Sequence, residues 1–135
     1  MTGVMTRLPF TLAVLLTISC ARPQNPLKEV LPVQVQRTWT LHEARNLPNE
    51  EAPKIISAQG LKRSLLAVYR GNGTIQVRVY EMGVEASAFE LIQKWRQPDG
   101  AAFYKGRYFI VADSSDVDRD TLSSFLQALQ HDLKA

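Results

Sequence analysis

The stretch Leu65–Tyr80, LLAVYRGNGTIQVRVY, decides the fold, because two strand-like segments flank a tight turn in it. Asn72-Gly73 is a favoured pair for a type I′ turn, whose two central residues both need a positive φ. A two-residue turn places Val68 opposite Val77, whereas a three-residue loop centred on Asn72 would place Val68 opposite Gln76. Because only the first register matches apolar partners, we predict a hairpin with the two-residue turn.

One face of this predicted hairpin combines aromatic side chains with an arginine. In the two-residue register, the side chains on that face are Tyr69, Gln76, Arg78 and Tyr80. Aromatic residues and arginine are enriched where proteins bind partners. This face is therefore a candidate binding surface for a peptide, a glycan or a protein. The alternative is that it is solvated or covered by the strand that carries Trp39.

Hydrophobic periodicity predicts the other elements. Before the hairpin, a strand is expected from Val33 to Leu41, followed by a polar loop at 43–49. Helices are expected at 50–59, 84–97 and 116–133, and a second hairpin at 101–104 and 107–113. The last helix has a core-facing stripe made of Leu122, Phe125, Leu126, Leu129 and Leu133.

This order, β-α-β-β-α-β-β-α, predicts an α+β fold. We expect an antiparallel sheet of about five strands, with helices packed on one face in a two-layer domain. The chain has 135 residues, with 16 Lys+Arg against 13 Asp+Glu, so one domain with a small positive charge is expected. A charge of +3 gives no reason to expect nucleic acid as a partner.

The N-terminal sequence has the layout of an export signal. A short start with Arg7 precedes an apolar stretch that is too short to span a membrane, so residues 1–19 are expected to be a signal peptide. The run LTISC at 16–20 resembles the lipobox of bacterial lipoproteins, although Thr17 stands where Leu is usual. The alternative is ordinary cleavage after Ala21.

The lipobox resemblance implies that Cys20 carries acyl chains and anchors the protein to a membrane. A non-acidic residue after the cysteine, Ala21, implies the outer membrane, with the domain facing the periplasm. A soluble periplasmic or secreted protein is the alternative. Residues 20–32 contain three prolines and are expected to be a tether, which leaves 33–135 as the globular domain. Without Cys20 the domain has no cysteine for an internal disulfide.

Few residues suggest chemistry. His42 and His131 lie in different elements, and no HExxH, GxSxG or P-loop pattern occurs. The only suggestive spacing is that of Asp116, Asp118 and Asp120, which matches the start of a calcium loop. The glycine and the closing glutamate of that motif are missing, so we interpret Ser115 or Asp116 as the cap of the last helix. No metal and no cofactor is expected.

Several segments together resemble a small bacterial family known only as a domain of unknown function. They are EAP at 51–53, GLKR at 60–63, YRG at 69–71, VRVYEM at 77–82, AFELIQKWR at 88–96 and GRYFIV at 106–111. The resemblance covers about two-thirds of the chain, and its most specific piece is VYEM followed by AFE. Members are often exported. The resemblance implies the fold layout and a location in the cell envelope, and it assigns no activity.

Two functions follow as hypotheses. The first is a non-enzymatic lipoprotein of the bacterial envelope, whose tethered domain is a binding or scaffold module for a protein or polymer partner. The second is a small envelope hydrolase or transferase that uses carboxylates brought together by folding. The first is preferred because no catalytic motif occurs in the sequence, and because nothing in it visibly builds the pocket that an enzyme of this size generally needs.

Overall fold

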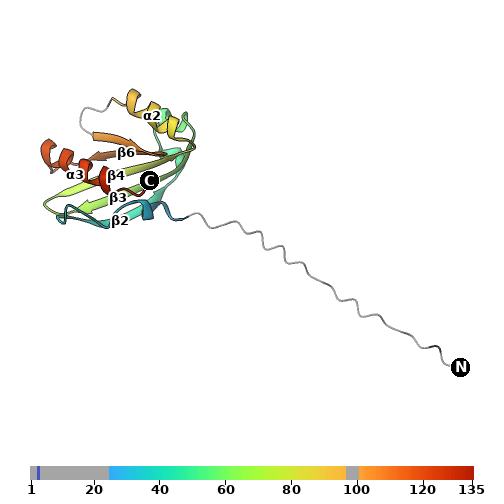
Figure 1. Ribbon diagram of the computed structural model, residues 1–135, viewed down its shortest axis with the longest axis horizontal. Coiled ribbons are helices and arrows are strands. Elements are labelled where there is room, and N and C mark those ends of the chain that lie inside the picture. Colours follow the sequence, from blue (N-terminus) through green and yellow to red (C-terminus); the bar gives the residue numbers. More distant parts are fainter. Residues whose placement is uncertain (1–2, 4–24, 97–100) are drawn as a thin grey trace.

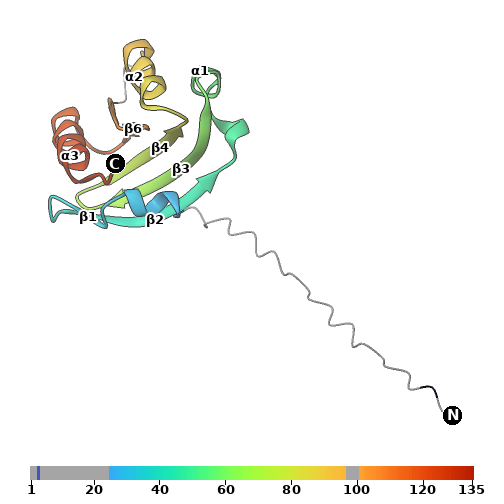
Figure 2. The same cartoon turned by 45° about the vertical axis from the view of Figure 1, so that its right-hand side comes forward.

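The computed structural model describes Gly3, residues 25–96 and residues 101–135 (Figure 1). It confirms an α+β fold with an antiparallel sheet, which has six strands in the order β1-β2-β3-β4-β6-β5. The strands are β1 (Gln34–Val35), β2 (Trp39–Leu47), β3 (Leu61–Arg70), β4 (Thr74–Met82), β5 (Ala101–Lys105) and β6 (Tyr108–Asp113). The sheet is strongly curved, so it has a concave and a convex face (Figure 2).

The expected first strand is divided in two, which explains the sixth strand. Gln36 and Arg37 adopt φ values of 54° and 57°, in the left-handed region, and the chain reverses there. Val35 consequently pairs with Trp39. The second part, β2, continues into the expected polar loop at 43–49 and ends at Leu47. A bulge after Leu41 changes which of its residues point inward, so the alternation expected from Val33 to Leu41 does not continue.

The predicted register of the first hairpin is wrong. Val68 pairs with Gln76, and the loop has three residues, closed by a hydrogen bond of 3.1 Å from the Gly71 N–H to the Gly73 carbonyl. This register places a different apolar set on the concave face, namely Leu65, Ala67, Tyr69, Ile75, Val77 and Val79, all at most 2% exposed. Because the pairing differs by one residue from the predicted register, Tyr69 lies on the face opposite to the one predicted for it.

Gly71 lies against the N-terminal end of β2 and leaves no room for a side chain. A Cβ at this position would be 2.5 Å from the Thr38 carbonyl oxygen and 3.0 Å from the Trp39 ring. Gly71→Ala is therefore expected to lower the free energy of unfolding by about 1–3 kcal/mol in a urea titration. Gly83→Ala is the control, because its Cβ would meet nothing closer than 3.6 Å. Equal losses in the two variants would contradict this account of the turn.

The main core fills the concave face. A 3₁₀ turn, η1 (Leu27–Val30), and the C-terminal helix, α3 (Arg119–Asp132), pack on this side of the sheet. Phe125 of α3 contacts Trp39 and Tyr69 edge-on, with ring centroids 5.8 and 5.2 Å apart. The predicted stripe of α3 is confirmed, since all five of its residues are buried: Leu122, Phe125, Leu126, Leu129 and Leu133.

Helices also cover part of the convex face, so the expected two-layer arrangement with helices on one face is wrong. The helices there are α1 (Lys54–Ser57), preceded by the 3₁₀ turn η2 (Asn49–Glu51), and α2 (Glu85–Lys94). They form a second core over Tyr80, Phe109 and Val111. Because β6 is apolar on both sides, it needs cover on both faces.

The helix expected at 50–59 is much shorter than predicted. Pro53 is the N-cap of α1, and the chain before it forms the separate turn η2. Proline has no N–H and is compatible only with the start of a helix, so it separates the two turns. Gly60, with a φ of +89°, follows the helix and leads into β3.

Residues 25–32 are part of the folded domain, which corrects the boundary of the expected tether at 20–32. Leu27 and Leu31 are 1% and 4% exposed and belong to the main core. The Tyr69 hydroxyl donates a hydrogen bond of 2.7 Å to the Pro32 carbonyl. Only residues 20–24 of the expected tether lie outside the described part. No helix among the described residues is both long and apolar enough to cross a bilayer.

Candidate functional site

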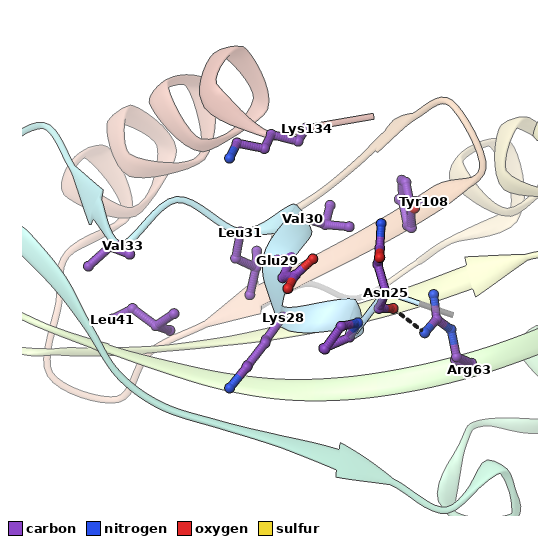
Figure 3. A pocket seen from close by; sticks show the side chains of 11 residues that line it. Asn25, Lys28, Glu29, Val30, Leu31, Val33, Leu41, Arg63, Tyr108 and Lys134 are labelled. Atoms are coloured by element: carbon purple, nitrogen blue, oxygen red, sulfur yellow. Dashed lines mark hydrogen bonds between the residues drawn. The ribbon is translucent and has the colours of Figure 1, made fainter. Parts of the chain in front are cut away.

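A cavity with a volume of about 670 Å³ lies on the concave face beside η1 (Figure 3). Its wall is built from η1, from β2 and β3, and from the chain after α3. Val33 and Leu41 lie at one end of it, and Arg63 and Tyr108 lie at the other. We call it the η1 cavity.

The η1 cavity combines an apolar lining with positive charge. Leu31 and Leu41 line it, and Val33 is 67% exposed although it is apolar. Lys28 and Lys134 also line the cavity, and within the described residues neither makes an ion pair. Among the described residues of the wall, Glu29 is the only acidic one. Such a site suits a molecule with an apolar part and an acidic group.

An ion network around the buried carboxylate of Glu81 holds the polar end of the η1 cavity. Glu81 is only 4% exposed, and it accepts a hydrogen bond of 2.7 Å from Nε of Arg63. Arg107 is the second cation, 3.9 Å from the other carboxylate oxygen. Arg63 also donates a hydrogen bond of 2.8 Å to the Asn25 carbonyl. Through Arg63, this network therefore holds the chain at Asn25 against β3.

The candidate binding face predicted on the first hairpin is only partly assembled. Tyr69 is fully buried on the concave face, where burial raises the pKa of its hydroxyl well above the usual value. Gln76, Arg78 and Tyr80 remain together on the convex face. Gln76 is exposed, and Tyr80 is 3% exposed and stacked on Phe109. Tyr69 is thus removed from the predicted face by the register of the hairpin.

The acidic residues before α3 have structural roles. Asp118 is the N-cap and accepts a hydrogen bond of 2.7 Å from the Thr121 N–H, so neither Ser115 nor Asp116 caps the helix. Asp116 instead accepts a bond of 3.0 Å from the Thr74 N–H. Asp120 is exposed in the first turn of α3. Among the residues described, no cluster of His, Cys, Asp or Glu could hold a metal ion.

The N-cap makes stability depend on pH. The hydrogen bond from the Thr121 N–H lowers the pKa of Asp118. A carboxyl with a lowered pKa stabilises the fold above its ordinary pKa of about 4, and this contribution is lost as the pH falls through the lowered value. Asp118→Ala should therefore melt a few degrees below the wild type at pH 7, and the difference should shrink toward pH 2.

Melting curves from pH 7 to pH 2 measure this difference. Asp120→Ala, which removes a nearby acidic side chain outside the cap, is the control. A gap between Asp118→Ala and the wild type that stays constant down to pH 2 would contradict the assignment of the cap.

Sequence reasoning missed the lining of the η1 cavity. The sequence pattern places residues 25–31 in the tether, and Lys134 lies after the last helix. Neither segment is therefore expected to line a cavity, although both do. The available signal was the spacing of Leu27 and Leu31, four residues apart, which is typical of one helical face. Cys20, the predicted site of lipid attachment, lies outside the described residues.

Comparisons with known proteins found no matching family model, no similar curated protein and no similar solved structure.

Proposed function

We propose that this chain is a binding module of the bacterial envelope, anchored to a membrane by acyl chains on Cys20. Its ligand is a small amphipathic molecule with an acidic headgroup, and the binding site is the η1 cavity. The observation that carries the proposal is this cavity of about 670 Å³, which is apolar at one end and has in its wall two lysines that make no ion pair with any described residue. Small-molecule sites commonly have volumes of about 300–1,000 Å³.

The position of the cavity supports a ligand that comes from the membrane. Asn25 lines the cavity, and five residues, 20–24, precede it from the predicted attachment site onward. A chain of that length reaches at most about 17 Å when fully extended. A lipid on Cys20 would therefore hold the cavity close to the membrane surface. The outer membrane, with the domain facing the periplasm, stays part of the proposal.

Binding is favoured over the hydrolase or transferase alternative because Glu29 is the single carboxylate among the described residues of the cavity wall, and three other acidic side chains have structural partners. Glu81 is paired with Arg63, and Asp118 caps α3. Asp113 is paired with Arg78 at 3.1 Å. Carboxylates that hold the structure in this way are poorly placed to act as general acids or bases.

Photo-crosslinking in native membranes tests the proposal. A benzophenone amino acid replaces Val33, which is 67% exposed and lines the cavity. The same substitution at Val84, which is 58% exposed and outside the cavity, is the control. We expect irradiation to attach a small amphipathic molecule at position 33 and none at position 84. The absence of an adduct at 33, or the same adduct at both positions, would overturn the proposal.

A further inference from the structure

A second, smaller cavity lies on the convex face and has a volume of about 160 Å³. It is separate from the η1 cavity, which opens on the other side of the sheet. Its wall includes Arg45, Ser64, Arg78, Tyr80 and Glu51. We call it the convex-face pocket. Its volume corresponds to roughly five water molecules, at about 30 Å³ each.

The strand register brings these side chains together from three strands. Ser64 of β3 pairs with Tyr80 of β4. Two residues further along the same face, Leu66 pairs with Arg45 on one side and with Arg78 on the other. Arg45 and Arg78 therefore lie on either side of Leu66, the residue that follows Ser64 on this face of β3. No loop rearrangement is needed to assemble this group, because every member except Glu51 is on a strand.

Ser64 is the feature that points to a ligand. It is only 2% exposed, and its hydroxyl has no hydrogen-bond partner among the described residues, although it lines the pocket. A buried hydroxyl without a partner is unfavourable, and native structures contain few of them. A bound group that accepts a hydrogen bond would satisfy it.

The other donors favour a negatively charged group. Arg45 is exposed and makes no ion pair within the described residues, so its guanidinium is available. Arg78 also forms an ion pair with Asp113, with 3.1 Å between Nη1 of Arg78 and Oδ2 of Asp113. Burial raises the pKa of Tyr80, so its hydroxyl keeps its proton and can donate. Glu51 is the one acidic side chain in the wall and opposes an anion.

We propose that the convex-face pocket binds a compact oxyanion, a phosphate or carboxylate group, through Arg45, Arg78 and the Ser64 hydroxyl. Arginine offers paired N–H donors to either group, and the serine hydroxyl donates from the floor of the pocket. The Tyr80 hydroxyl is a further donor. This site is additional to the η1 cavity and does not depend on it.

Calorimetric titration of the full-length protein in detergent tests this site. Inorganic phosphate and acetate are the two probes, in separate titrations at pH 7. We expect saturable binding of at least one of them, weakened about tenfold or more by Arg45→Gln. Arg70→Gln, an exposed arginine that lines neither cavity, should leave binding unchanged. Glu51→Gln should strengthen binding, because it removes the opposing charge.

Ser64→Ala separates a ligand-binding role from a structural one. It removes a hydroxyl that has no partner, so the melting temperature without ligand should stay equal or rise. Binding of the anion should nevertheless weaken about fivefold or more. A role in folding alone would lower the melting temperature and leave binding intact.

The outcomes are distinct. Tighter binding of phosphate identifies a phosphate group, and tighter binding of acetate identifies a carboxylate. Failure of both probes to bind the wild type overturns the proposal, and so does binding that Arg45→Gln and Ser64→Ala leave unchanged. Binding that Val33→Asp, in the η1 cavity, weakens as much as Arg45→Gln does would place the anion in the η1 cavity and overturn the proposal, so the two sites can be judged independently.

Discussion

Replacing Phe125 with alanine is expected to lower the free energy of unfolding by about 3–5 kcal/mol. Phe125 is fully buried and connects α3 to the sheet through its edge-on contacts with Trp39 and Tyr69. Its removal leaves a cavity between the helix and the concave face. Because domains are stable by only about 5–15 kcal/mol, the variant should unfold at a much lower urea concentration. Tryptophan fluorescence follows the transition, since Trp39 lies beside the substituted ring.

Phe89→Ala is the matched control for Phe125. Phe89 is 43% exposed on α2, and its ring contacts Tyr104 with centroids 5.6 Å apart. Losing this partly exposed contact should cost about 1 kcal/mol or less. Equal losses in the two variants would contradict the assignment of Phe125 to the centre of the core.

Replacing Arg63 with methionine is expected to cost about 2–4 kcal/mol of unfolding free energy. The substitution leaves the buried Glu81 carboxylate with Arg107 as its only cation, at 3.9 Å. Burying a charge whose partner has been removed is strongly unfavourable. The value lies below that of a fully buried pair because the Arg63 side chain is 30% exposed. Urea titration at pH 7 measures the loss.

Two further variants check the reason for this loss. Arg107→Met should cost less than about 1 kcal/mol, because Arg107 is 48% exposed and farther from Glu81. The double variant Arg63→Met with Glu81→Leu should recover part of the stability, since it leaves no unpaired buried charge. If Arg63→Met were no more harmful than Arg107→Met, the ion network would not hold this end of the domain.

Elements with a strong and unbroken pattern were predicted well. The stripe of α3 repeats every three or four residues, and all its members are buried. The second hairpin also forms where expected, with its turn before β6. Gly106 in that turn adopts a φ of +57°, which favours glycine. In both cases, local chemistry and burial favour the same structure.

The first hairpin shows where local reasoning fails. The pair Asn72-Gly73 and the match of Val68 with Val77 both favoured the two-residue turn, yet the hairpin adopts the other register. The close packing of Gly71 under Trp39 and the burial of Tyr69 against Phe125 are tertiary contacts. No local pattern encodes them, so the register could not be decided from this segment alone.

The candidate sites were predicted in part for the same reason. Arg78 and Tyr80 were placed correctly on one face because both belong to β4 and are two residues apart. Ser64 and Arg45 were not foreseen, because their position beside Arg78 depends on the pairing of three strands. The η1 cavity depends on residues near both ends of the described chain, from Asn25 to Lys134. Residues so far apart in the sequence form no local pattern from which such a site could be predicted.

The mass of the full-length protein, extracted from native membranes in mild detergent, tests the central claim most directly. Denatured, the protein should have the mass of a chain that begins at Cys20 and carries acyl groups. Under native conditions it should be heavier by one bound amphipathic molecule, and Val33→Asp should lose that molecule. A bare chain that begins at Arg22, with the same mass in both states, would contradict both the membrane anchor and the ligand.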